Sequence, residues 1–297
     1  YQEYLGANPF KLGIVAGADA HTAFSDNEEF NYSGVHGAVD ATPVKRLSGA
    51  GQTAGEAAVN FGTPGATAVW ADENTRAGIF DALKRKESYG TSGPLIRLRF
   101  FGGWSFPKSM AGSDDFAKLG YQGGVPMGGD LAAMPADAKA PSFAVWAMKD
   151  PNSGNLDRVQ IIKGWYENGY PQEKIYDVVW SDNRKPDSKT GKLPSVGTTV
   201  DIKNATYTND SGDSQLSAVW TDPDYKPEHH AVYDVRVLEI PTPRWSTYDA
   251  KQLGVDPPAG VAATIQERAW SSPIWYTTDS KLVKKAPTYP QLHQIFK

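Results

Sequence analysis

The sequence of 297 residues contains no cysteine, which excludes disulfides, cysteine-ligated zinc and thiol catalysis together. An excess of one charge is also lacking, because acidic and basic side chains are intermixed and the formal net charge is −4. Without a basic block, nucleic acid or an anionic membrane is not an expected partner. No apolar run is long enough to span a bilayer. The absence of cysteine fits an oxidising compartment served without disulfides, so we expect a periplasmic or extracytoplasmic bacterial protein.

Aromatic residues, glycine and proline are abundant instead. The chain has 29 Gly and 21 Pro, together with nine Trp, 14 Tyr and 11 Phe. This composition predicts loop-rich β structure and offers a stacking surface for a ring-shaped ligand. Hydrophobic residues make up 40% of the chain, enough to bury a sizeable core.

Residues 1–101 alternate strand and helix signals. Short apolar runs at 12–18 and 66–70 predict buried strands, and the segment 95–101 alternates as a strand should. Between them, an amphipathic pattern that begins at Arg76 predicts a helix. We therefore expect an α/β part here, in the order strand, long loop, strand, helix, strand.

Residues 102–297 have a different pattern. Turn residues separate closely spaced strand-like segments, which predicts an antiparallel β-sandwich-like region followed by a C-terminal tail. The segments are 143–148, 158–165, 174–180, 215–220 and 231–240.

Asp19 and His21 end the first apolar run. Side chains two apart on a strand point to the same face, so the carboxylate and the imidazole can converge on one point. An oxygen donor beside an imidazole suits Zn, Mn or Fe. The alternative is that Asp19 caps the next helix and His21 is hydrogen-bonded nearby.

Arg76 and His36 are further candidates. An arginine just inside a helix could hold an anionic substrate with both arms of its guanidinium group; its alternative is an ion pair with Asp72 or Glu73. His36, in the long loop, could swing over the site as a proton donor or ligand, or simply face solvent.

The string Gly17-Ala-Asp19-Ala-His21 resembles the last metal-binding motif of the polymerase and histidinol phosphatase (PHP) superfamily. Longer strings are similar to a PHP-related group catalogued as domain of unknown function 3604. They are Asn8-Pro-Phe-Lys11, Trp70-Ala-Asp-Glu-Asn-Thr-Arg76, Tyr89-Gly-Thr-Ser-Gly-Pro94, Phe100-Phe-Gly-Gly-Trp104, Pro241-Thr-Pro-Arg-Trp245 and Glu267-Arg-Ala-Trp-Ser-Ser-Pro-Ile-Trp-Tyr276.

The resemblance implies that residues 1–101 form the C-terminal part of a distorted PHP-type β/α barrel. It also implies two or three divalent transition-metal ions at the barrel mouth, where superfamily members hydrolyse phosphoesters. Only Asp19 and His21 match ligands of that superfamily. The opening His-x-His motif and the middle ligands have no counterpart in this sequence. We therefore expect a preceding segment of the same polypeptide to supply them and to pair with the first strand.

Two functions of different classes follow. The first is a metal-dependent hydrolase for a small anionic substrate, a phosphoester or related anionic ester, with Asp19 and His21 as metal ligands and with Arg76 as a further site residue. The second is a non-catalytic protein that binds a carbohydrate or aromatic ligand through its Trp-rich β region. The sequence is compatible with an oligomer in either case.

Overall fold

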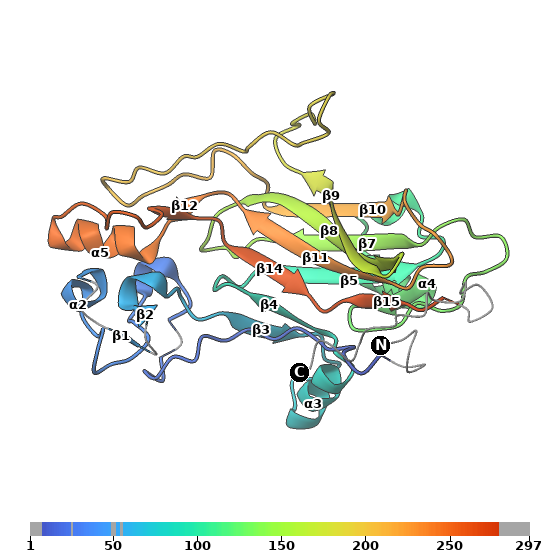
Figure 1. Ribbon diagram of the computed structural model, residues 1–297, viewed down its shortest axis with the longest axis horizontal. Helices are drawn as coiled ribbons and strands as arrows, with labels where there is room; N and C mark the ends of the chain where they lie inside the picture. The colour runs from blue at the N-terminus through green and yellow to red at the C-terminus, as the bar shows by residue number, and fades with distance from the viewer. Residues whose placement is uncertain (1–7, 25, 49–51, 54–55, 279–297) are drawn as a thin grey trace.

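The computed structural model describes residues 8–24, 26–48, 52–53 and 56–278, and two antiparallel sheets dominate it (Figure 1). The seven-stranded sheet has the order β3 (Ala66–Val69), β4 (Ser88–Thr91), β14 (Arg268–Ser271), β11 (Ala231–Glu239), β8 (Leu156–Glu167) and β9 (Tyr170–Trp180), with β15 (Ile274–Tyr276) paired to β11. The four-stranded sheet has the order β10 (Gln215–Thr221), β7 (Ser142–Met148), β5 (Arg97–Gly103) and β6 (Gly124–Pro126).

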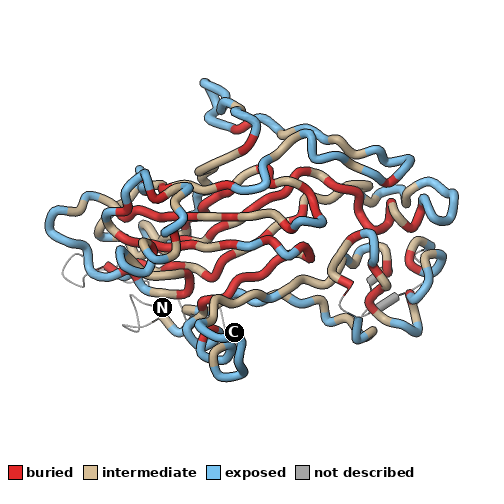
Figure 2. Tube along the Cα trace, turned by 180° about the vertical axis from the view of Figure 1, so that it is seen from behind, coloured by how far each residue is buried: buried red, intermediate tan, exposed pale blue. Residues whose placement is uncertain are grey.

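The two sheets face each other across a shared core. Strand β11 alternates buried and half-buried residues, as expected where one face of a strand is packed. Its Tyr233 ring lies 4.3 Å from the ring of Phe143 on β7, and Phe143 stacks on Phe100 of β5 at 5.6 Å. Figure 2 shows the buried residues concentrated in these strands. The predicted antiparallel, β-rich character is therefore confirmed, and the two facing sheets are compatible with the predicted sandwich-like arrangement.

Phe143 provides a test of this core. Because its ring is fully buried between the sheets, Phe143→Ala should lower the free energy of unfolding by about 3–5 kcal/mol. The matched control is Phe80→Ala on the exposed side of α3 (Arg76–Lys84), for which we expect a change within about 0.5 kcal/mol. Denaturant titration of both variants measures the difference, and equal losses would contradict this packing.

Short helices and strands gather at one end of the sandwich, drawn at the left of Figure 1. We call this group the helical end. Its elements are η1 (Glu29–Asn31), α2 (Pro43–Leu47), β1 (Gln52–Thr53), β2 (Glu56–Ala57), η2 (Ala58–Asn60), β12 (Thr242–Pro243), α5 (Trp245–Leu253) and β13 (Thr264–Ile265). Tyr32, Val35 and Trp245 form its apolar centre. A buried ion pair between Arg46 Nε and Asp249 Oδ2, at 2.8 Å, joins α2 to α5.

On the other side, η3 (Lys108–Met110) and α4 (Phe116–Gly123) accompany the four-stranded sheet. Phe116 of α4 packs against Phe101, which faces away from the shared core. Among the described residues, no helix has both the length and the apolar character needed to cross a bilayer.

The predicted barrel strand at 12–18 is wrong. This segment is extended, but it carries no strand assignment, and Leu12 and Val15 are 63% and 65% exposed. The apolar run suggested burial between two neighbouring strands. Instead, the segment lies on the face of the seven-stranded sheet.

The described part of the chain contains no closed barrel. Strands β3 and β4, on either side of α3, are antiparallel neighbours, so α3 is not the crossover helix of a parallel β/α unit. The helix itself was predicted correctly, and Thr75 caps it by accepting a hydrogen bond from Gly78 N at 3.1 Å. The predicted division at residue 101 falls inside β5, which pairs with β6 and β7.

Candidate functional site

The segment before Asp19 is held to the sheet by hydroxyl groups. Ala16 makes two hydrogen bonds with the side chain of Thr67. Its N–H donates to Thr67 Oγ1 at 2.9 Å, and its carbonyl accepts from the same hydroxyl at 2.8 Å. Ser88 Oγ donates to the carbonyl of Ile14 at 2.9 Å, and Ser272 Oγ accepts from Ile14 N at 2.8 Å. These hydroxyls satisfy backbone groups that a neighbouring strand would otherwise pair.

Glycine allows the close approach. A Cβ on Gly90 would lie 2.8 Å from Cβ of Ala16 and 3.4 Å from Cγ2 of Ile14. A Cβ on Gly65 would likewise lie 2.8 Å from Cβ of Ala16. The segment therefore crosses the sheet where two glycines leave room for it, and its path fixes where the chain reaches Asp19.

Asp19 and His21 come together just beyond this crossing. Asp19 has a φ of +51°, a left-handed conformation that costs most residues energy but that Asp tolerates better than most. The N–H of His21 donates to the carbonyl of Val35 at 2.7 Å. Asp19 Oδ1 then lies 3.3 Å from His21 Nε2, with the Asp19 side chain 98% exposed. The pair is thus fixed through its backbone and open to solvent.

This spacing fits two ligands of one metal ion. Ligand atoms at 2.0–2.1 Å from a tetrahedral ion are separated by about 3.3–3.4 Å. The ring of His36 lies 5.2 Å from that of His21. The backbone N–H of His36 donates a hydrogen bond to Asp40 Oδ1 at 2.8 Å. No group of three or more acidic, His or Cys side chains among the described residues is arranged to hold a metal. Asp19 and His21 therefore form at most part of a ligand set.

Arg76 lies elsewhere. It is the exposed first residue of α3, which follows the end of β3. Asp19 lies beyond the other end of β3, because Gly65, directly before that strand, is adjacent to Gly17. The structure therefore brings Asp19 and His21 together but does not bring Arg76 to them, and the role of Arg76 stays a prediction.

The Trp-rich strands put their rings mainly into the packed interior. All nine Trp side chains are buried or half-buried. Those that pack against the shared core are Trp70, Trp104, Trp165 and Trp220. Trp245 is buried in the helical end.

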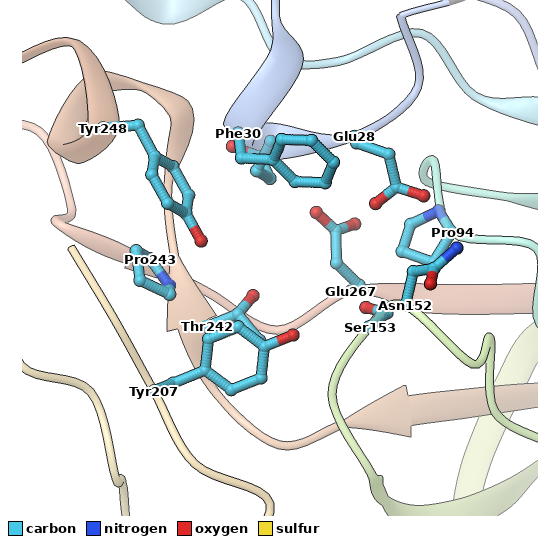
Figure 3. A pocket seen from close by; sticks show the side chains of 11 residues that line it. Glu28, Phe30, Pro94, Asn152, Ser153, Tyr207, Thr242, Pro243, Tyr248 and Glu267 are labelled. Carbon is cyan, nitrogen blue, oxygen red and sulfur yellow. The ribbon is translucent and has the colours of Figure 1, made fainter.

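A cavity of about 260 Å³ lies where the helical end meets the residues preceding β14 (Figure 3). We call it the acidic cavity. Its walls include Glu28, Glu29, Phe30, Tyr207, Tyr248 and Glu267. Figure 3 shows the Glu267 carboxyl group pointing into its centre.

The acids around the acidic cavity have raised pKa values. Burial raises the pKa of Glu29 and of Glu267, and that of Glu267 rises to about 9. Burial, Asp150 and Glu29 raise the pKa of Glu28. Burial, aided by Asp150, raises the pKa of the neighbouring Glu239 to about 8.

The family model of a protein of unknown function, DUF3604, matches residues 1–278. The chain belongs to this DUF3604 family. No curated protein and no solved structure gives a match to it. The resemblance of the long strings to the DUF3604 group is therefore confirmed. The link from this family to the PHP superfamily stays a prediction.

Sequence reasoning did not single out Glu28, Glu29 or Glu267 as a site. The adjacent acids at 28 and 29 looked like part of a polar loop, and Glu267 was noted only within a family-like string. The one local signal is Glu267 itself, a lone acid directly before a short strand that is buried or half-buried throughout. A buried acid needs a partner, but the sequence does not say which one.

Proposed function

We propose that this DUF3604 protein is a metal-dependent hydrolase of a phosphoester or related anionic ester, and that Asp19 and His21 hold a divalent transition-metal ion. The observation that carries this proposal is the 3.3 Å separation of Asp19 Oδ1 and His21 Nε2 at a left-handed residue. Backbone in a sparsely populated conformation is concentrated at functional sites. The resemblance of the Gly-Ala-Asp-Ala-His string to the last PHP motif supports the same chemistry.

The residues of this chain would bind the metal ion and fix its position. When bound, Zn, Mn or Fe lowers the pKa of a water and stabilises negative charge on an ester oxygen. The Asp19 carboxylate contributes charge, and His21 contributes a neutral imidazole whose position is fixed by its backbone bond to Val35. Because the Asp19 side chain faces solvent, a small anionic substrate can reach it.

The remaining ligands would come from a preceding segment of the same polypeptide. Leu12, Val15 and Phe24 flank the Asp19–His21 pair in sequence and are exposed despite their apolar side chains. A further surface packed over this segment would bury them and bring additional donors to the pair. A site of two or three ions, as in the PHP superfamily, requires such donors.

Metal removal tests this function. Purified protein treated with a chelator and dialysed should lose hydrolysis of p-nitrophenyl phosphate esters, because the attacking water is no longer activated. Adding back Mn²⁺ or Zn²⁺ should restore it, whereas Ca²⁺, which prefers six to eight oxygen ligands, should not. Hydrolysis that survives complete metal removal would contradict the proposal.

A further inference from the structure

The acidic cavity contains an acceptor with no donor. Glu267 is only 1% exposed. Its Oε2 accepts from the hydroxyl of Ser92, but its Oε1 has no hydrogen-bond partner among the described residues. A buried carboxylate oxygen without a donor costs free energy, and protonation of Glu267, whose pKa burial raises, removes this cost only while the group is neutral. The side chain is therefore poised to receive a donor from a ligand.

Arg244, the cation whose charge acts on Glu29, already makes hydrogen bonds to other groups. Arg244 donates from Nη1 to Ser246 Oγ at 3.0 Å, and from Nη2 to the carbonyls of Val59 and Phe61 at 2.8 and 2.6 Å. Its charge lowers the pKa of Glu29. The hydrogen bonds that Arg244 makes thus go to partners other than the carboxyl groups of the cavity.

The shape and walls of the cavity favour an organic cation over a metal ion. The described residues contain no group of three or more acidic, His or Cys side chains arranged to hold a metal, and about 260 Å³ is far more than one ion fills. Figure 3 shows Phe30, Tyr207 and Tyr248 around the Glu267 carboxyl group. Aromatic rings beside carboxylates are a favourable setting for an ammonium group.

We propose that the acidic cavity binds a primary ammonium group, with the carboxylates of Glu267 and Glu29 as its counter-ions and the aromatic walls around its alkyl chain. The ammonium N–H groups take the place of the proton that the Glu267 carboxyl group otherwise holds. Binding therefore releases that proton to solvent and leaves every bond of the ligand intact. This site is separate from the Asp19–His21 pair and does not depend on it.

Calorimetric titration with n-butylammonium tests the proposal, and n-butanol is the matched neutral probe. We expect saturable binding of the amine, none of the alcohol, and proton release, seen as a dependence of the heat on the ionisation enthalpy of the buffer. Nα-acetyl-lysine methylamide presents the same group, so its affinity relative to n-butylammonium shows whether a free amine or a lysine side chain fits better. No saturable binding of either amine, or equal binding of n-butanol, would overturn the proposal.

Two variants locate the binding. Glu267→Gln keeps the side-chain volume and should weaken n-butylammonium at least about tenfold, since loss of a buried charge-assisted bond exceeds 1.4 kcal/mol. Phe30→Ala, at a side chain 62% exposed, should fold normally and weaken binding about three- to fivefold. Glu228→Gln, at an exposed acid, is the control and should bind as wild type. Wild-type affinity in both Glu267→Gln and Phe30→Ala would overturn the assignment.

Discussion

Replacing Asp19 by Gly is expected to lower ester hydrolysis by at least about 100-fold. Loss of a residue that only supports a metal ligand already lowers activity by up to about 100-fold. The same change should leave the free energy of unfolding within about 1 kcal/mol of wild type, because glycine adopts the left-handed backbone at this position without strain. Steady-state kinetics and denaturant unfolding of the same preparation measure the two effects.

Ala23→Gly is the matched control. Ala23 also has a positive φ, 58°, in the same loop, but its methyl group cannot hold a metal. We expect this variant to gain up to about 1 kcal/mol of stability from the same relief of backbone strain and to keep full activity. If Asp19→Gly instead unfolded the protein while Ala23→Gly did not, Asp19 would be a structural residue.

Stability should fall as the pH rises from about 5 to about 8. The folded-state pKa of Glu239, raised to about 8 mainly by burial, lies above its unfolded value, and that of Glu267 is raised as well. In this window the folded state binds more protons than the unfolded state, so each such acid lowers the free energy of unfolding by up to about 1.4 kcal/mol per pH unit. Exposed acids with lowered pKa, such as Asp187, act only at lower pH.

Glu239→Gln should flatten this dependence. The amide oxygen can still accept from Ser153 Oγ, which now donates to Glu239 Oε2 at 2.5 Å, and it carries no charge at any pH. Asp150 and Lys149 remain the charged groups that face it. Chemical denaturation at pH 5, 6, 7 and 8 measures the slope. A slope identical to that of wild type would show that Glu239 is already ionised at neutral pH.

The sequence was most informative where packing follows local pattern. Strand β11 alternates buried and half-buried residues over the shared core, and Thr75 marks the start of α3 through a capping bond made by its own side chain. Their signals lie within a few residues of each element, so no distant contact was needed to predict them.

The failures have nonlocal causes. The run at 12–18 looked like a buried strand, but the hydroxyls of Thr67, Ser88 and Ser272 bind its backbone from the sheet face. Gly90 of β4 leaves room for Ala16 of this segment, since a Cβ on Gly90 would lie 2.8 Å from Cβ of Ala16. Neither relation can be read from local spacing.

The candidate site was partly predictable. Asp19 and His21 do converge, but they do so through a left-handed turn at Asp19 and not through strand alternation. Glu29 and Glu267 are far apart in the sequence, and only the docking of the helical end against the residues before β14 brings them together. That docking depends on contacts such as Glu29 with Trp245 N–H, which no motif spacing encodes.

Metal content compared between wild type and Asp19→Asn, each as the complete protein, tests the central claim most directly. Asn keeps the side-chain volume and tolerates the left-handed backbone, so both proteins should fold, and elemental analysis after identical purification reports on ligation alone. Asp114→Asn, at an exposed acid remote in sequence, is the control. The proposal predicts bound Zn, Mn or Fe in wild type and in Asp114→Asn, and a marked loss in Asp19→Asn. Equal metal content in all three proteins, or none in wild type, would contradict it.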